Sequence, residues 1–200
     1  MIKVIAFDLG GVLFSEGKAV AYKRLEADFS YDTKVINDIL TSPQSIDLRK
    51  GLMADNDFWG WAQQNLPINY DVNAIKTYWY DGYIIDEDIV ELLRSLKGKY
   101  ELMVFSGNVE SRIDYLETKY NFRELFDKEV YSFDYHHIKP EKMFVEDMIN
   151  ASGVLPKEIA YIDDKQEDSR EAIPFGINVI IYKTGNIPKL KDELRNLGVK

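Results

Sequence analysis

The sequence lacks cysteine altogether and contains only two histidines among 200 residues. Without cysteine there are no disulfides, no catalytic thiolates and no cysteine ligands for a metal, which fits a reducing compartment. Basic residues are scarce relative to acidic ones, with 25 Lys and Arg against 34 Asp and Glu and a net charge of −9. Nucleic acids and anionic membranes attract clustered basic residues, and no basic stripe is visible, so we expect neither as a partner.

Long apolar runs are also absent. No run approaches the length of a membrane-spanning helix, and the N-terminal run is interrupted by Asp8 without the charged region and cleavage site of a signal peptide. The chain is nevertheless 46% hydrophobic, which is enough to bury a full core. We therefore expect a cytoplasmic globular protein.

Four short polar motifs each follow an apolar, strand-like run, and the first is the most informative. The run from Val4 to Phe7 ends in Asp8, and Gly10 and Gly11 follow closely. An aspartate that ends a buried strand on a glycine turn indicates a place where the backbone approaches a ligand. Asp8 is therefore a candidate nucleophile, although an ordinary turn would use the same residue types.

The second and third motifs could bind an anion. The run 102–105 ends in Ser106 just before a helical pattern over 109–120, and a helix N-terminus offers free backbone amides to an anion. Lys139 precedes Pro140, which suits the first position of a helix that continues through Ile149. Taken singly, a helix cap and a solvated lysine explain these residues equally well.

The fourth motif is acidic. The run 159–162 ends in Asp163 and Asp164, and Asp168 follows four residues after Asp164, a spacing that one helical turn could bring to the same face. Adjacent carboxylates repel each other unless a cation or hydrogen-bond donors compensate, and hard oxygen ligands suit Mg²⁺. The alternative is a helix start whose acids interact with the helix dipole.

In this order the four motifs resemble those of the haloacid dehalogenase-like hydrolase superfamily, over nearly the whole chain. The resemblance implies that Asp8 attacks phosphorus to form an aspartyl-phosphate, with Lys139 as the second catalytic residue and Mg²⁺ as cofactor. A carboxylate facing a phosphate needs a cation and a lysine to offset the repulsion. The remaining implied roles are phosphate binding by Ser106, Gly107, Asn108 and Lys139, metal ligation by Asp8, the Gly10 carbonyl and Asp164, and support of the metal shell by Asp163 and Asp168.

Gly10 is the main departure from the family pattern, because phosphatases of the superfamily usually carry a second aspartate there as general acid and base. Losing such a group removes about 10²- to 10⁴-fold of rate. Either another residue supplies the proton, or the substrate has a good leaving group, or the protein binds without turnover. The candidate substitutes are Glu16, Asp81, His136 and His137.

The order of the strand-like runs predicts an α/β fold with a doubly wound parallel sheet. The runs lie near 2–8, 100–105, 129–133, 159–163 and 177–182 and alternate with helical patterns in the C-terminal half. Ligands of such sheets bind at the carboxyl ends of the strands, where all four motifs fall.

The segment 15–83 shows only helical patterns, with breaks near Pro43, Gly51 and Pro67. In the superfamily, an insertion at this point is the helical cap of subfamily I, and the turn at Arg49 is similar to that of sugar-phosphate phosphatases. We expect a core domain of 1–14 plus 84–200 and a helical cap domain of 15–83.

The leading hypothesis is a Mg²⁺-dependent phosphatase acting on a small phosphorylated metabolite. The alternative is a catalytically impaired protein that binds phosphate esters or serves in regulation, which Gly10 motivates. Hydrolysis of a carbon–halogen bond, as in 2-haloacid dehalogenases, is less favoured because those relatives need no metal and the acidic cluster at 163–168 would be unexplained.

Overall fold

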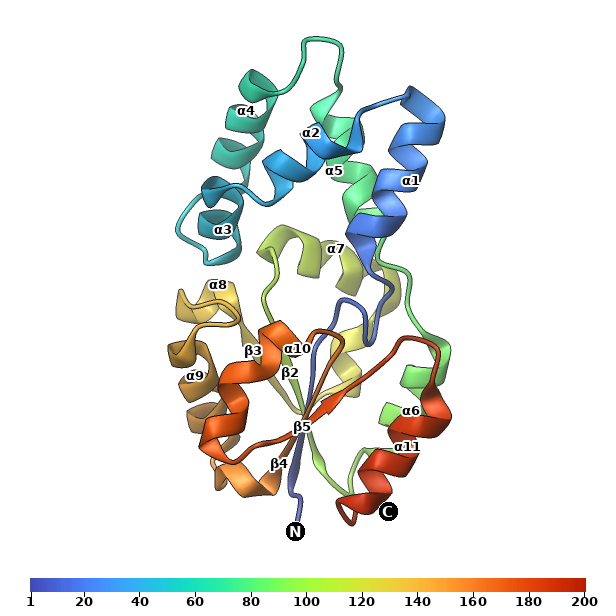
Figure 1. The fold of residues 1–200 in the computed structure, drawn as a ribbon, viewed down its shortest axis with the longest axis vertical. Helices are drawn as coiled ribbons and strands as arrows, with labels where there is room; N and C mark the ends of the chain where they lie inside the picture. The colour runs from blue at the N-terminus through green and yellow to red at the C-terminus, as the bar shows by residue number, and fades with distance from the viewer.

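The computed structural model describes residues 1–200 and contains one five-stranded sheet, all of whose strand pairs are parallel. The strands are β1 (Val4–Phe7), β2 (Glu101–Ser106), β3 (Lys128–Tyr131), β4 (Ile159–Asp163) and β5 (Asn178–Ile181). Their spatial order is β3-β2-β1-β4-β5, so the chain winds outward in both directions from β1 (Figure 1). The predicted doubly wound α/β fold is confirmed.

Helices cover both faces of the sheet. They are α6 (Glu87–Leu96), α7 (Glu110–Tyr120), α8 (Ser132–Tyr135), α9 (Lys142–Ser152), α10 (Gln166–Ser169) and α11 (Ile187–Asn196), with short 3₁₀ turns at Phe122–Leu125, Pro156–Glu158 and Arg170–Phe175. Because side chains of a strand alternate between faces, Ile5 and Phe7 pack with α6, α7 and α11, whereas Val4 and Ala6 pack with α9. Burial on both faces explains why the strands read as continuous apolar runs.

The strand register sets the position of the polar motifs. Phe7, the last residue of β1, pairs with Val104 of β2 and with Ile162 of β4. The residues that follow each strand therefore meet at one edge of the sheet, on either side of the point where the winding reverses. This edge is where ligands of doubly wound sheets bind.

Between β1 and α6 the chain forms five helices and no strand, and Figure 1 shows them as a layer above the carboxyl ends of the strands. They are α1 (Gly17–Phe29), α2 (Thr33–Leu40), α3 (Pro43–Arg49), α4 (Asp55–Asn65) and α5 (Val72–Asp81). The apolar cluster on the α6 and α11 face of the sheet continues into this layer. None of the helices of the structure is both long and apolar enough to cross a membrane.

Two helices differ from the sequence-based expectation. The break expected near Pro43 separates α2 from α3, but no helix was expected directly after it; Pro43 is the first residue of α3, and the Ser42 side chain caps this helix by accepting a hydrogen bond from the Ser45 amide. Proline suits the first turn because the amide it lacks would have no partner there. The second difference is α11, which packs through Leu190 and Leu194 in a region after residue 182 where no helix is expected from the sequence.

Candidate active site

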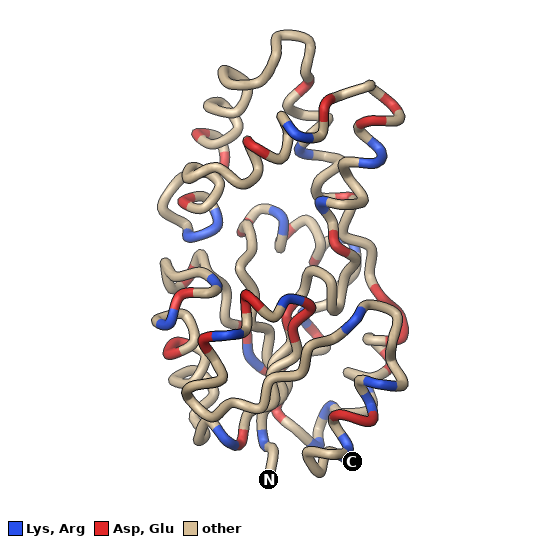
Figure 2. The backbone as a smooth tube through the Cα atoms, viewed as in Figure 1, with Lys and Arg blue, Asp and Glu red and all other residues tan.

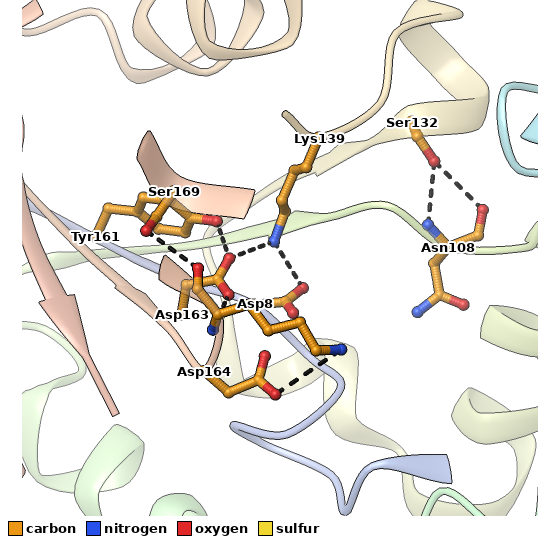
Figure 3. A network of polar contacts seen from close by, with 9 residues as sticks. Asp8, Asn108, Ser132, Lys139, Tyr161, Asp163, Asp164 and Ser169 are labelled. Atoms are coloured by element: carbon orange, nitrogen blue, oxygen red, sulfur yellow. Dashed lines mark hydrogen bonds and ion pairs between the residues drawn. The ribbon is translucent and has the colours of Figure 1, made fainter. Parts of the chain in front are cut away.

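The carboxyl ends of β1 and β4 bring two aspartates to one lysine. Lys139, in the loop before α9, places its Nζ 3.0 Å from Asp8 Oδ1 and 2.8 Å from Asp163 Oδ2 (Figure 3). The Lys139 side chain is 5% exposed and that of Asp8 13%. These three residues form the centre of the site, although Asp8 and Asp163 are 155 positions apart in the sequence (163 − 8).

The pKa values of this group follow from burial and from mutual charge. Burial alone would lower the pKa of Lys139, but the charges of Asp163 and Asp8 outweigh it and raise that pKa above its usual range. Burial would likewise raise the pKa of Asp163, yet Lys139 keeps it below the usual value. The pKa of Asp8 is raised, because burial outweighs the opposing charge of Lys139. An added positive charge beside Asp8 would therefore favour its ionised form.

Asp164 adds a third carboxylate that fits a divalent cation. Asp8, Asp163 and Asp164 each offer an oxygen, and these atoms all lie within 4.8 Å of one another. Asp164 Oδ1 is buried and has no hydrogen-bond partner. Burial, followed by the charges of Asp8 and Asp163 against that of Lys165, raises the pKa of Asp164 to about 7. A hard cation such as Mg²⁺ matches these oxygen donors and would satisfy the unpartnered atom.

The glycine turn after Asp8 makes room for this arrangement. Gly11 has a φ of +79°, and a Cβ there would lie 2.2 Å from Asp164 Oδ2, so only glycine fits. The carbonyl of Gly10, the expected backbone ligand, accepts no backbone hydrogen bond.

Asp163 and Asp168 occupy different positions. Asp163 accepts hydrogen bonds from Lys139, from the Tyr161 hydroxyl and from the Lys165 backbone amide, so it anchors the lysine and the following turn. Asp168 lies on the wall of the adjacent cavity and is not part of the three-carboxylate group. The spacing of four residues does not correspond to one helical turn, because α10 begins at Gln166, after Asp164.

The residues that follow β2 line the same cavity. Ser106, Gly107 and Asn108 lie on its wall together with Asp8 and Lys139, and the cavity has a volume of about 130 Å³. The Asn108 side-chain oxygen is already engaged, since it accepts hydrogen bonds from the Val109 amide and from Arg112 Nε. Any contact of Asn108 with a ligand therefore involves its other atoms.

Tyr83 fills the space beside Gly10. A Cβ on Gly10 would lie 3.3 Å from Tyr83 Cε1 and 3.9 Å from its hydroxyl, and a Cβ on Gly17 would lie 2.1 Å from the same ring. Glycines at both positions let the Tyr83 ring reach the cavity wall, next to where a second aspartate would stand in a relative.

Of the four expected substitutes for that aspartate, one lines the cavity. Glu16 does so and forms an ion pair of 3.3 Å with Lys165. The others are held elsewhere: Asp81 by Tyr115 and Lys119, His136 by the Lys50 carbonyl and His137 by Asp147.

Tyr83 and Arg112 are among the cavity residues that were not assigned to the site from the sequence. Arg112 stands between Glu110 and Asp114 in a charged stretch, which reads as a solvated helix face. One local feature of the sequence pointed to Arg112: it follows Asn108 by four residues, a spacing at which side chains on a helix can touch. In the structure the two side chains form a hydrogen bond of 2.7 Å.

The fold is thus a Rossmann-like doubly wound sheet that carries an aspartate after its central strand, a buried lysine and a carboxylate cluster at one edge. The family model described as haloacid dehalogenase-like hydrolase matches residues 62–182. The chain is also 42% identical to an uncharacterized protein of Dictyostelium discoideum, covering 98% of this chain and 97% of the relative. The chain belongs to the haloacid dehalogenase-like hydrolase family.

Solved structures share the fold. A HAD-like family hydrolase from Porphyromonas gingivalis has a TM-score of 0.80 at 24% identity, covering 98% of both chains. A HAD family enzyme from Bacteroides thetaiotaomicron, in complex with magnesium and inorganic phosphate, has a TM-score of 0.78 at 21% identity, covering 95% of this chain and 99% of the other. L-2-haloacid dehalogenase from Xanthobacter autotrophicus has a TM-score of 0.69 at 21% identity, covering 98% and 83%.

Proposed function

We propose that this hydrolase is a Mg²⁺-dependent phosphatase that acts on a small phosphorylated metabolite through an aspartyl-phosphate on Asp8. The observation that carries the proposal is the unpartnered, buried Oδ1 of Asp164 beside a carboxylate that Lys139 holds at 3.0 Å. A cation site next to a positioned carboxylate suits attack on an anionic phosphorus centre. The complex of the Bacteroides relative with magnesium and inorganic phosphate supports the same chemistry.

The chain's own residues divide the work as follows. Asp8 attacks phosphorus, and the bond from phosphorus to the leaving oxygen breaks as that oxygen takes up a proton. Water then attacks the same phosphorus, the bond to Asp8 breaks, and the proton released from water returns to the donor. Lys139 and Ser106 stabilise the charge of the phosphoryl oxygens. Bound Mg²⁺, held by Asp8, Asp164 and the Gly10 carbonyl, would supply the remaining positive charge.

The proton donor must be a residue other than Gly10. The Tyr83 hydroxyl lies 3.9 Å from where a Cβ at position 10 would be, and it can protonate a leaving alkoxide and recover the proton from the attacking water. Glu16 lines the same cavity and is the second candidate. The phenol is favoured because it occupies the side of Gly10 where the family's aspartate stands.

The helical layer completes the site in this proposal. Lys18, Arg49 and Trp79 from α1, α3 and α5 line the same cavity as Asp8 and Ser106. We assign residues 15–83 to a cap domain that closes over the site and residues 1–14 plus 84–200 to the core. A cavity of about 130 Å³ then restricts access to small esters.

The test is phosphate release, with and without Mg²⁺, from an aryl phosphate and from a panel of alkyl phosphates. An aryl leaving group needs little protonation, so its turnover reports the nucleophile separately from the proton donor. Asp8→Asn should fold and lose Mg²⁺-dependent release of both, and full activity of this variant would contradict the proposal. Tight binding of esters by the wild type without any release would favour the second candidate, a phosphate-ester binding protein, which Gly10 motivates.

A further inference from the structure

Arg112 is a buried cation without an acidic partner. It is 2% exposed, and the carbon of its guanidinium lies 4.4 Å from the centres of both the Trp79 and the Tyr83 rings. Its Nε donates to Asn108, whereas Nη1 is buried and has no hydrogen-bond partner. Arginine is almost never buried in this way unless an anion pairs with it, because an unpaired buried charge is costly.

Two further cations face the same cavity. Arg49 lies at the end of α3 and Lys18 in the first turn of α1, and neither forms an ion pair with a carboxylate. Burial, and then the charge of Arg112, lowers the pKa of Arg49; burial, and then the charge of Arg49, lowers that of Lys18. Three cations that repel one another across one cavity favour the entry of an anion.

The acidic residues of the cavity form no ion pair with these cations, although the charge of Asp168 acts on Arg49 and that of Glu16 on Lys18 at longer range. Asp8 pairs with Lys139 and Glu16 with Lys165, while Asp168 comes within ion-pair distance of none of the three. A chain with a net charge of −9 thus leaves three basic side chains unpaired at one place. Figure 2 shows basic positions of α1, α3 and α7 where the helical layer meets the carboxyl edge of the sheet.

This basic group shares one cavity with the proposed reaction centre. Arg49 and Arg112 line it together with Ser106, Lys139 and Asp8. We propose that Arg112 and Arg49 bind a second anionic group of the substrate, so that the preferred ester carries a carboxylate or a second phosphate besides the phosphoryl group at Asp8. The planar guanidinium matches either anion with paired hydrogen bonds. The inference rests on the proposed phosphatase function and narrows its substrate class.

The test compares matched esters that differ in the second anion. Glycerol 3-phosphate is paired with 3-phosphoglycerate, and glucose 6-phosphate with glucose 1,6-bisphosphate, and kcat/KM is measured for each. We expect the wild type to prefer the ester that carries two anionic groups, in at least one pair, by tenfold or more. A charge-assisted hydrogen bond makes a difference of about 10- to 100-fold, so Arg112→Met and Arg49→Met should reduce the ratio within that pair by this factor.

Arg24→Met is the matched control, because Arg24 is an exposed cation of α1 outside the cavity, and its ratio should equal that of the wild type. Arg112→Lys keeps the positive charge but loses the planar guanidinium, so it should retain part of the preference for the ester with two anionic groups. Arg49→Met remains informative if Arg112→Met fails to fold. Preference in the carboxylate pair or in the bisphosphate pair identifies the second anion. Equal ratios in the wild type and both arginine variants would overturn the inference.

A binding measurement separates this inference from the proposed function. Asp8→Asn protein is titrated calorimetrically with 3-phosphoglycerate, glucose 1,6-bisphosphate and the partner esters that lack the second anionic group. Tighter binding of an ester with two anionic groups would uphold the second-anion site even if no ester is hydrolysed, provided that this binding is weaker in the double variant Asp8→Asn/Arg49→Met. Hydrolysis of aryl phosphate without any difference in binding or turnover within the pairs would uphold the phosphatase and refute the site.

Discussion

Asp164→Asn should stabilise the metal-free protein above neutral pH, although it removes a proposed metal ligand. The carboxyl group is mostly buried, its Oδ1 has no partner, and its pKa rises to about 7 from an ordinary value of 3.8. Because the folded-state pKa is the higher one, the ionised group opposes folding. The resulting decrease in the free energy of unfolding starts near the pKa of Asp164 in the unfolded chain, grows as the pH rises, and is complete above about pH 7.

The magnitude follows from the two pKa values. A rise from 3.8 to about 7 corresponds to about 4 kcal/mol of lost stability above pH 7. The Asp164 side chain is 15% exposed, and solvent screening reduces this figure to roughly 2 kcal/mol. Asparagine has the same shape and no charge, and its amide can donate to the neighbouring carboxylates. A chain of this size gains about 2–4 °C in Tm per kcal/mol, so we expect a rise of roughly 4–8 °C.

The assay is thermal unfolding in EDTA at pH 8 and near pH 4, repeated at pH 8 with Mg²⁺. Near pH 4 the Tm difference between Asp164→Asn and the wild type should shrink to below about 2 °C, because Asp164 is then protonated in the folded state. Mg²⁺ at ten times its Kd stabilises the wild type by about 1.4 kcal/mol, and Asp164→Asn should lose most of that gain.

Asp47→Asn, an exposed aspartate of α3 without an ion pair, serves as the control and should change neither result. A lower Tm of metal-free Asp164→Asn at pH 8 would refute the reasoning. That outcome would mean that the folded protein stabilises the Asp164 charge without a cation.

Two further predictions concern the surroundings of Gly10 and Gly11. Tyr83→Phe should reduce kcat for alkyl phosphates by about 10²-fold or more and leave aryl phosphate turnover far less affected, because only the alkoxide needs the proton. Steady-state kinetics on both esters decides this, and a loss confined to Glu16→Gln would assign the donor role to Glu16 instead. Gly11→Ala should lower Tm more than Gly98→Ala, since both positions have a φ of +79° but only a Cβ at 11 meets another side chain, that of Asp164. The left-handed conformation alone costs about 1 kcal/mol, so equal Tm losses would show that the Asp164 contact is unimportant.

The sequence alone determined the sheet and the place of the site. Apolar runs that end in Asp8, Ser106 and Asp163 predict parallel strands, and parallel strands must align their carboxyl ends at one edge. The structure places Lys139 within hydrogen-bond distance of Asp8 and Asp163, two of these residues. The local pattern was insufficient for α3, because a proline that begins a helix and one that interrupts a helix look alike in sequence.

Only the tertiary structure decided what surrounds the reaction centre. Tyr83 reaches Gly10 because Gly17 also lacks a side chain, a contact across more than sixty residues of sequence (83 − 17 = 66) that no local periodicity records. Arg112 stands among charged neighbours and becomes buried because Trp79 of α5 stacks on it. Periodic apolar positions show which face of a segment is buried, but they do not show which other segment covers that face. The second point depends on how the helices pack over the sheet.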